Sequence, residues 1–109
     1  MTWLLRDGDV LAAVEVADSL GKRAKGLLGL SGYEGAMLLP RTRSVHTLGM
    51  RFPIDVAFCD KDMVVLDTVR LRPWRLGRPR RRGRSVIEAQ AGSFERWGLR
   101  IGDTVEVRG

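Results

Sequence analysis

The sequence predicts a mainly β (α+β) protein, a small compact β-barrel or sandwich with two short helices. Short apolar stretches recur along the chain between Gly/Asp turn signals, the pattern of strands joined by tight turns. The 109 residues contain no repeat or linker, so residues 1–109 are expected to form a single domain. A hydrophobic content of 44% is ordinary for a globular protein, and a chain of this length can build a core without disulfides.

The first predicted elements are a β-hairpin and a basic helix. Residues 2–6 and 10–17 flank Asp7-Gly8-Asp9, and an Asp-Gly pair readily supplies the positive φ of a tight turn. Ser19 is typical of a helix N-cap, because apolar residues follow it at helical spacing with basic residues between them. Gly29 ends this predicted helix.

Two buried strands are predicted in the middle of the chain. Residues 36–39 form a short apolar run, and a second run, residues 54–59, begins after Pro53, where a missing N–H is tolerated. Successive side chains of a strand point to opposite faces, so Asp55 shares its face with small residues. A buried carboxylate must be paired or hydrogen-bonded, which makes Asp55 a residue of interest.

The second half of the chain is predicted to contain three strands, a long loop and a short helix. The loop is marked by proline, glycine and charge, and the helix lies between two glycines. In order, these are the strand 63–71, the loop 72–83, the strand 85–90, the helix 94–97 ended by Gly98, and the strand 104–108.

Positive charge is concentrated in one part of the sequence. The net charge is +6, and eight of the sixteen arginines lie in loop 70–84, which contains no acid. Such a field attracts nucleic acid, phosphorylated ligands or other acidic partners, and Trp74 adds a stacking surface. A solvated loop and arginine-rich codon usage are the plainer alternatives. The candidate contacts for nucleic acid or another anion are Arg72, Trp74, Arg75, Arg80, Arg81 and Arg82.

A second candidate site precedes and enters the strand 54–59. There, cationic side chains and the only histidine lie close in sequence to a buried carboxylate, a set suited to a small anionic or polar ligand. The alternative is structural, with Asp55 fixing the preceding loop through an arginine or backbone amides, and with the histidine bonded to backbone. The residues of this candidate site are Arg41, Arg43, His46, Arg51 and Asp55.

No catalytic motif is present, and a non-enzymatic binding or accessory domain is the leading hypothesis. Only Thr47 and Ser44 stand near His46 as nucleophiles, so a hydrolase-like use of His46 and Asp55 is the weakest hypothesis. No Cys/His spacing fits a metal, no cofactor is expected, and Cys59 is expected to be an inert core thiol. The sequence lacks a run of about 20 apolar residues and a signal peptide, so no membrane span and a cytoplasmic location are expected.

The order of these motifs resembles the domain of unknown function 192 family, also called uncharacterised protein family 0127. The resemblance rests on the segment Met50–Phe58, the segment Glu88–Gly92 and the pair Gly102-Asp103, and it covers nearly the whole chain. It implies a compact β-rich domain of bacteria and archaea without an established biochemical activity.

Two positions depart from the family pattern. Many members have Trp-Met-Lys-Asn-Thr where this chain has residues 48–52, Leu-Gly-Met-Arg-Phe. The usual glycine after the Asp turn is Met63 here. A positive φ would be strained for methionine, so the turn is expected to differ in geometry.

Overall fold

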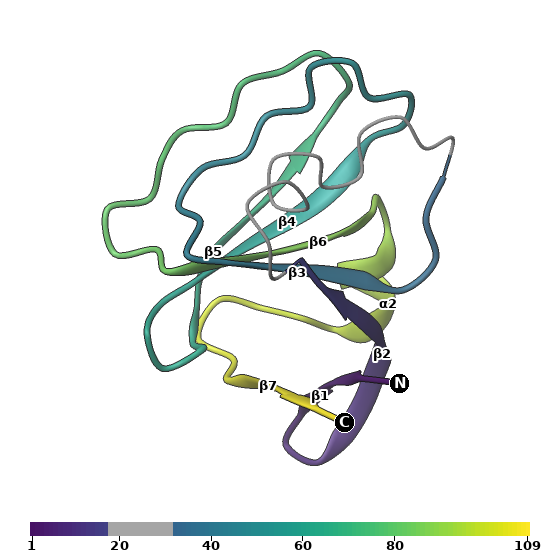
Figure 1. Ribbon diagram of the computed structural model, residues 1–109, viewed down its shortest axis with the longest axis vertical. Helices are drawn as coiled ribbons and strands as arrows, with labels where there is room; N and C mark the ends of the chain where they lie inside the picture. The colour runs from purple at the N-terminus through teal and green to yellow at the C-terminus, as the bar shows by residue number, and fades with distance from the viewer. Residues whose placement is uncertain (18–31) are drawn as a thin grey trace.

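The computed structural model describes residues 1–17 and 32–109. Within them, seven strands form one sheet in the order β5-β4-β6-β3-β2-β1-β7, and a short helix lies beside it (Figure 1). The elements are β1 (Trp3–Arg6), β2 (Asp9–Val16), β3 (Ala36–Pro40), β4 (Ile54–Cys59), β5 (Val65–Leu71), β6 (Ser85–Gln90), α2 (Ser93–Trp97) and β7 (Val105–Arg108).

The predicted hairpin and the second predicted helix are confirmed. Asp7 and Gly8 both have positive φ, 53° and 84°, and turn β1 into the antiparallel strand β2. Glycines in the left-handed region stand at both ends of α2, where they begin and end the helix. The helix expected from Ser19 to Gly29 lies outside the described residues.

The sequence predicts a barrel or a sandwich, and the barrel alternative is wrong because the sheet does not close. Strands β5 and β7 are the two edges of the sheet, and among the described residues they approach each other through one isolated bridge, between Val64 and Thr104. Both residues precede their strands, so no ladder forms between β5 and β7, and a barrel requires such a ladder. The sheet instead curls, so that side chains of β1, β2 and β7 pack against side chains of β3, β6 and β4 in one core.

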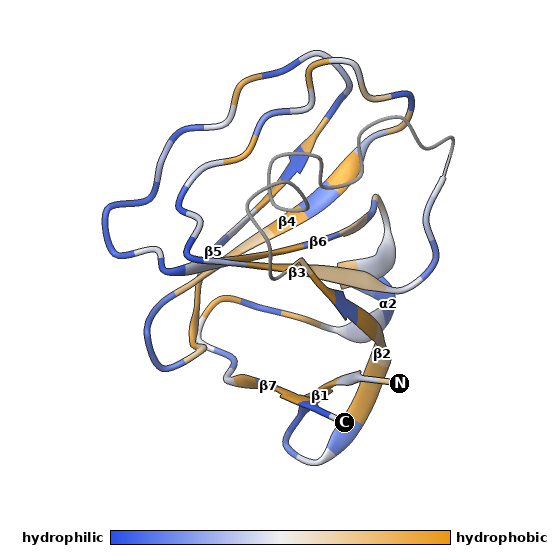
Figure 2. Ribbon diagram, viewed as in Figure 1, coloured by the Kyte–Doolittle hydropathy of each residue, from blue (hydrophilic) through white to orange (hydrophobic). Residues whose placement is uncertain are grey.

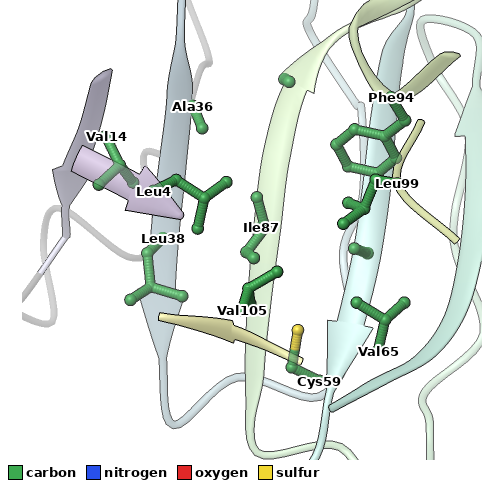
Figure 3. Close-up of a cluster of buried hydrophobic side chains, with 12 residues drawn as sticks. Leu4, Val14, Ala36, Leu38, Cys59, Val65, Ile87, Phe94, Leu99 and Val105 are labelled. Carbon is green, nitrogen blue, oxygen red and sulfur yellow. The ribbon is translucent and has the colours of Figure 1, made fainter. Parts of the chain in front are cut away.

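The first hydrophobic core lies inside this curl. Leu4 and Val14 project from β1 and β2 and Val105 from β7, and they meet Ile87 of β6 (Figure 3). Phe94 of α2 extends the same cluster. Burying a side chain of this kind contributes about 1.5–3 kcal/mol, so contacts between distant segments stabilise the curl.

A second hydrophobic core lies on the opposite face of β4. The alternation predicted for this strand is confirmed, since Ala57 and Cys59 belong to the first core whereas Val56 and Phe58 belong to the second. Val45, Met50 and Phe52 of the segment before β4 pack into the second core. Because both faces are covered, all residues of β4 are buried.

The turn between β4 and β5 corrects the expectation made for Met63. Met63 has φ 63°, so methionine adopts the left-handed conformation that glycine would take without strain. Its N–H donates to the Asp60 carbonyl at 3.1 Å, and its sulfur accepts the Ser85 hydroxyl at 3.5 Å. Its side chain also packs against the first core, and these contacts offset the backbone strain.

Candidate functional site

Asp55 joins β4 to α2 and β5. Its Oδ1 accepts a hydrogen bond from Nε of Arg70 at 3.0 Å. Its Oδ2 accepts the backbone N–H groups of Gly92 at 2.9 Å and of Phe94 at 3.2 Å. Gly92 is the N-cap of α2 and has no side chain to satisfy these amides, so Asp55 does so from the neighbouring strand. Both carboxylate oxygens of this buried residue are therefore occupied.

The structure does not bring Asp55 together with the four loop residues proposed beside it. Asp55 is on the α2 side of β4, whereas Val45, in the middle of that loop, packs on the other side. The shallow hollow next to Asp55, about 320 Å³ in volume, is lined by residues of β4, β5 and α2. A binding pocket made from the whole set of five stays a prediction without direct support from this arrangement.

Two loops far apart in sequence lie side by side. Residues 41–47 run along residues 72–84 (Figure 1). We call the surface that they form the two-loop face. Backbone hydrogen bonds join them along its length: Thr42 N–H to Arg84 O (3.2 Å), Arg80 N–H to Arg43 O (2.9 Å), Gly77 N–H to Val45 O (2.8 Å) and Thr47 N–H to Arg75 O (2.8 Å).

Thr47 and Gly77 fix the distance between the two loops. Thr47 is fully buried, and its hydroxyl donates to the Arg72 carbonyl at 2.5 Å and accepts the Arg75 N–H at 2.8 Å. A Cβ on Gly77 would lie 2.7 Å from the Val45 carbonyl oxygen, so only glycine fits there without a shift. The two arginine-bearing stretches that the sequence keeps apart thus form one surface with a defined spacing.

Two of the loop 70–84 arginines have structural partners. Arg70 pairs with Asp55, and Arg80 pairs with Asp67 at 2.7 Å. The guanidinium of Arg80 also lies over the ring of Phe58, 4.2 Å from its centroid. Arg80 was a candidate contact for an anion, and in the structure it fastens its loop to β4 and β5.

The remaining arginines of the two-loop face point to solvent. None of them has a carboxylate partner among the described residues. Trp74 lies between two of them with 65% of its surface exposed. Figure 2 shows that both loops are mostly hydrophilic along their course. The exposed arginines are Arg41, Arg43, Arg72, Arg75, Arg78, Arg81, Arg82 and Arg84.

His46 lies on the two-loop face, and Arg51 lies beyond its end. The backbone of His46 bridges to Leu76, and its Nδ1 accepts the Leu48 N–H at 3.2 Å. Thr47, the nucleophile nearest to His46 in sequence, has its hydroxyl buried and bonded to the other loop. The arrangement therefore offers cationic and aromatic groups for binding, and the Thr47 hydroxyl is not available to His46 as a nucleophile.

Glu88 is the buried acid whose position sequence reasoning missed. It lies on β6 between Met37 of β3 and Val56 of β4, 4% exposed. Its Oε1 has no hydrogen-bond partner within the described part of the chain. Burial raises the pKa of Glu88 to about 7. A glutamate between the apolar residues Ile87 and Ala89 is the signal that could have indicated this burial.

Other chemistry is limited in residues 1–17 and 32–109. Cys59 is fully buried, and burial followed by the charge of Asp60 raises its pKa to about 12, which keeps it a thiol. These residues contain no group of three or more His, Cys, Asp or Glu side chains suited to a metal ion. None of their helices is long and apolar enough to cross a membrane.

Sequence comparison places residues 3–107 in a known family model. The matching model is DUF192, described as an uncharacterized ACR. The UPF0127 protein of Pyrococcus abyssi is 38% identical over 98 residues, which cover 85% of this chain and 84% of that protein. The UPF0127 protein of Pyrococcus furiosus is 35% identical over 103 residues, which cover 90% and 89%.

Two solved structures share the fold. A protein of unknown function from Novosphingobium aromaticivorans superimposes with a TM-score of 0.80 at 22% identity, covering 96% of this chain and 82% of that one. A proposed transcription regulator from Sinorhizobium meliloti gives a TM-score of 0.69 at 23% identity, covering 97% and 91%. At these identities the likeness concerns the fold alone.

Proposed function

The chain belongs to the DUF192 family, and we propose from the geometry of its own residues that it is a non-enzymatic domain that binds single-stranded nucleic acid. The contact surface is the two-loop face. The observation that carries the proposal is the backbone pairing of residues 41–47 with residues 72–84, which brings exposed arginines of both loops onto one face. The exposed Trp74 lies at the end of this face where its N–H donates to the Thr47 carbonyl.

The charge on this face suits a phosphate backbone. Guanidinium groups pair with phosphate oxygens in a bidentate manner, and releasing counterions from the nucleic acid supplies much of the binding free energy. Arg72 and Arg75 flank Trp74, so a base stacked on the indole would have phosphate contacts on either side. Because backbone hydrogen bonds already order both loops, less conformational entropy is lost on binding.

A small anionic or polar ligand is the second proposal, and it has weaker support. That site was expected to use Arg41, Arg43, His46, Arg51 and Asp55. Both carboxylate oxygens of Asp55 accept hydrogen bonds from Arg70 and the start of α2, so a ligand there would have to displace existing hydrogen bonds. The acidic surface of a protein partner is an alternative that the experiment below separates.

Fluorescence anisotropy with a labelled single-stranded oligonucleotide, at several salt concentrations, tests the proposal. The double variant Arg75→Gln/Arg78→Gln should bind more weakly and should lower the slope of log K against log salt by about 1 per lost phosphate contact. Trp74→Ala should weaken binding about 5- to 100-fold, the range for one lost base stack.

The matched control is Arg96→Gln/Arg100→Gln, which removes the same charge from α2 and the turn after it. This control should change affinity less than twofold. If both double variants lose the same amount of affinity for the oligonucleotide and Trp74→Ala has no effect, the binding is nonspecific electrostatic attraction and the proposal is contradicted. Equal binding of a labelled polyglutamate would favour an acidic protein partner.

A further inference from the structure

A basic hollow lies at one end of the two-loop face. It has a volume of about 480 Å³ and is open to solvent on one side. Its lining consists of four cations and one carboxylate: Lys61, Arg81, Arg82, Arg84 and Asp60. The volume is within the range of about 300–1,000 Å³ typical of small-ligand pockets.

The register of two central strands creates this hollow. Cys59, the last residue of β4, stands opposite Ser85, the first residue of β6. The chain that leaves β4 and the chain that enters β6 therefore meet at the same end of the sheet. The Arg84 N–H donates to the Cys59 carbonyl at 2.8 Å and holds Arg84 next to the β4–β5 turn that carries Lys61. These residues are too far apart in sequence for a motif to reveal them.

Both walls of the hollow are held by backbone hydrogen bonds. On one side, Arg81 and Arg82 are the central residues of a turn that the Gly83 N–H closes on the Arg80 carbonyl at 2.9 Å. On the other side, Asp60 Oδ1 accepts the N–H groups of Asp62 (2.8 Å) and Val64 (3.0 Å).

The bonds made by Asp60 leave its carboxylate engaged with its own turn. No ion pair joins it to Arg81, Arg82 or Arg84 in the described part of the chain. The cations of the hollow thus keep their capacity for a ligand, and the backbone that carries them is already ordered before binding.

We infer that this hollow recognises a phosphomonoester group. A monoester carries a charge of about −1.5 to −2 at pH 7 and three exposed oxygens. A backbone diester carries a single charge and two free oxygens. A hollow lined by four cationic residues therefore favours the monoester over the diester, whereas the open part of the two-loop face suits diesters.

Two sources offer this group, the phosphorylated end of a nucleic-acid strand and a free nucleotide. The first source rests on the proposed function, because the rest of the strand would then lie along the two-loop face. The second source does not depend on that function. Lys61 belongs to the hollow but lies outside the two-loop face, so it allows the two proposals to be tested separately.

The test measures, by fluorescence anisotropy, the affinity of oligonucleotides of one sequence that carry either a phosphate or a hydroxyl at the unlabelled end. In one pair of strands this end is the 5′ end, and in a second pair it is the 3′ end. The full chain should bind one phosphorylated strand about fivefold more tightly than its hydroxyl counterpart. Lys61→Glu should reduce this ratio to near one, and Arg100→Glu, with the same charge change outside the hollow, should preserve it. Adenosine monophosphate should compete with the terminal phosphate, so that the affinity ratio falls to near one while the affinity for the hydroxyl strand stays unchanged.

Each other result has a defined meaning. Equal affinity for phosphorylated and hydroxyl strands at both ends overturns the inference and leaves the proposed function standing. If no strand binds, the proposed function fails, and calorimetry with adenosine monophosphate decides on the hollow. If adenosine monophosphate binds at one saturable site and Lys61→Glu weakens this binding, the result supports phosphate recognition by the hollow. If adenosine monophosphate does not bind, the inference is overturned.

Discussion

Asp55 shows how one buried carboxylate can organise its surroundings. It receives two backbone amides of α2 and one arginine, and it thereby replaces the cap that Gly92 cannot provide. Met63 shows the opposite situation, a residue that tolerates a strained φ of 63° because its side chain has good contacts. Individual side chains here serve first to hold the fold.

We expect Asp55→Ala to lower the free energy of unfolding by about 2–3 kcal/mol, because it removes the cap of α2 and leaves a buried N–H without an acceptor. Arg70→Gln should cost much less than Asp55→Ala, since the side chain of Arg70 is 55% exposed and its ion pair is screened by solvent. Urea unfolding followed by circular dichroism measures both. An equal loss in the two variants would contradict the capping role of Asp55.

Glu88 should make stability depend on pH. Its pKa rises from 4.5 to about 7 on folding, so the folded state binds this proton more tightly than the unfolded state does. Its stabilising contribution is therefore complete below pH 4.5 and is lost as the pH rises through 7.

Glu88→Gln should match the wild type near pH 4.5 and exceed its stability at pH 8 by about 3 kcal/mol, because the pKa of Glu88 rises from 4.5 to about 7 and each pKa unit corresponds to about 1.36 kcal/mol. Urea unfolding of both proteins at each pH measures the difference, in which the contributions of the other carboxylates cancel. A constant difference across this range would show that Glu88 does not titrate in it.

At the scale of elements, the two-loop face behaves as a single unit. Neither loop contains a strand, yet backbone hydrogen bonds join residues 41–47 to residues 72–84 throughout their length. Arg80 then fastens the pair to the sheet through Asp67 and Phe58. Backbone pairing of this kind orders long polar loops that would otherwise be mobile.

Gly77→Ala should disturb this unit. Its Cβ would lie 2.7 Å from the Val45 carbonyl oxygen, and overpacking of this kind costs about 1–3 kcal/mol. Gly32→Ala is the matched control, because its nearest contact would be an ordinary 3.5 Å. Thermal unfolding of both variants measures the effect, and we expect the melting temperature to fall only for Gly77→Ala. A similar change in both would show that the loops separate easily.

At the scale of the whole molecule, the curled sheet encloses one core and the two loops cover another. Strand β4, which lies between β5 and β6, contributes to both cores, so opening either side would expose it. Cys59 lies at the end of β4 and is fully buried, which makes it a probe of this organisation.

Cys59 should react with a thiol reagent only when the molecule opens. Its pKa of about 12 leaves almost no thiolate at pH 8, and its burial denies access. Labelling should be slow in buffer without urea. It should accelerate at the urea concentration at which circular dichroism shows the midpoint of unfolding. Fast labelling in buffer would show that this end of the sheet opens independently of the rest.

The sequence by itself determined the β-rich class, the hairpin at Asp7-Gly8, the alternation along β4, the short helix α2 and the family. These features depend on local turn chemistry and on side-chain periodicity, which neighbouring residues encode. The sequence also marked Asp55 as a carboxylate in need of partners, although it suggested the preceding loop rather than Arg70 and α2.

Only the tertiary structure decided that the sheet curls without closing, that Asp55 caps α2, and that two arginine-bearing loops form one face. It also placed Lys61 beside Arg84 and buried Glu88 between β3 and β4. Each of these outcomes depends on which strands become neighbours and in what register. Long-range packing decides which strands pair, and this pairing leaves no local pattern in the sequence from which it could be predicted.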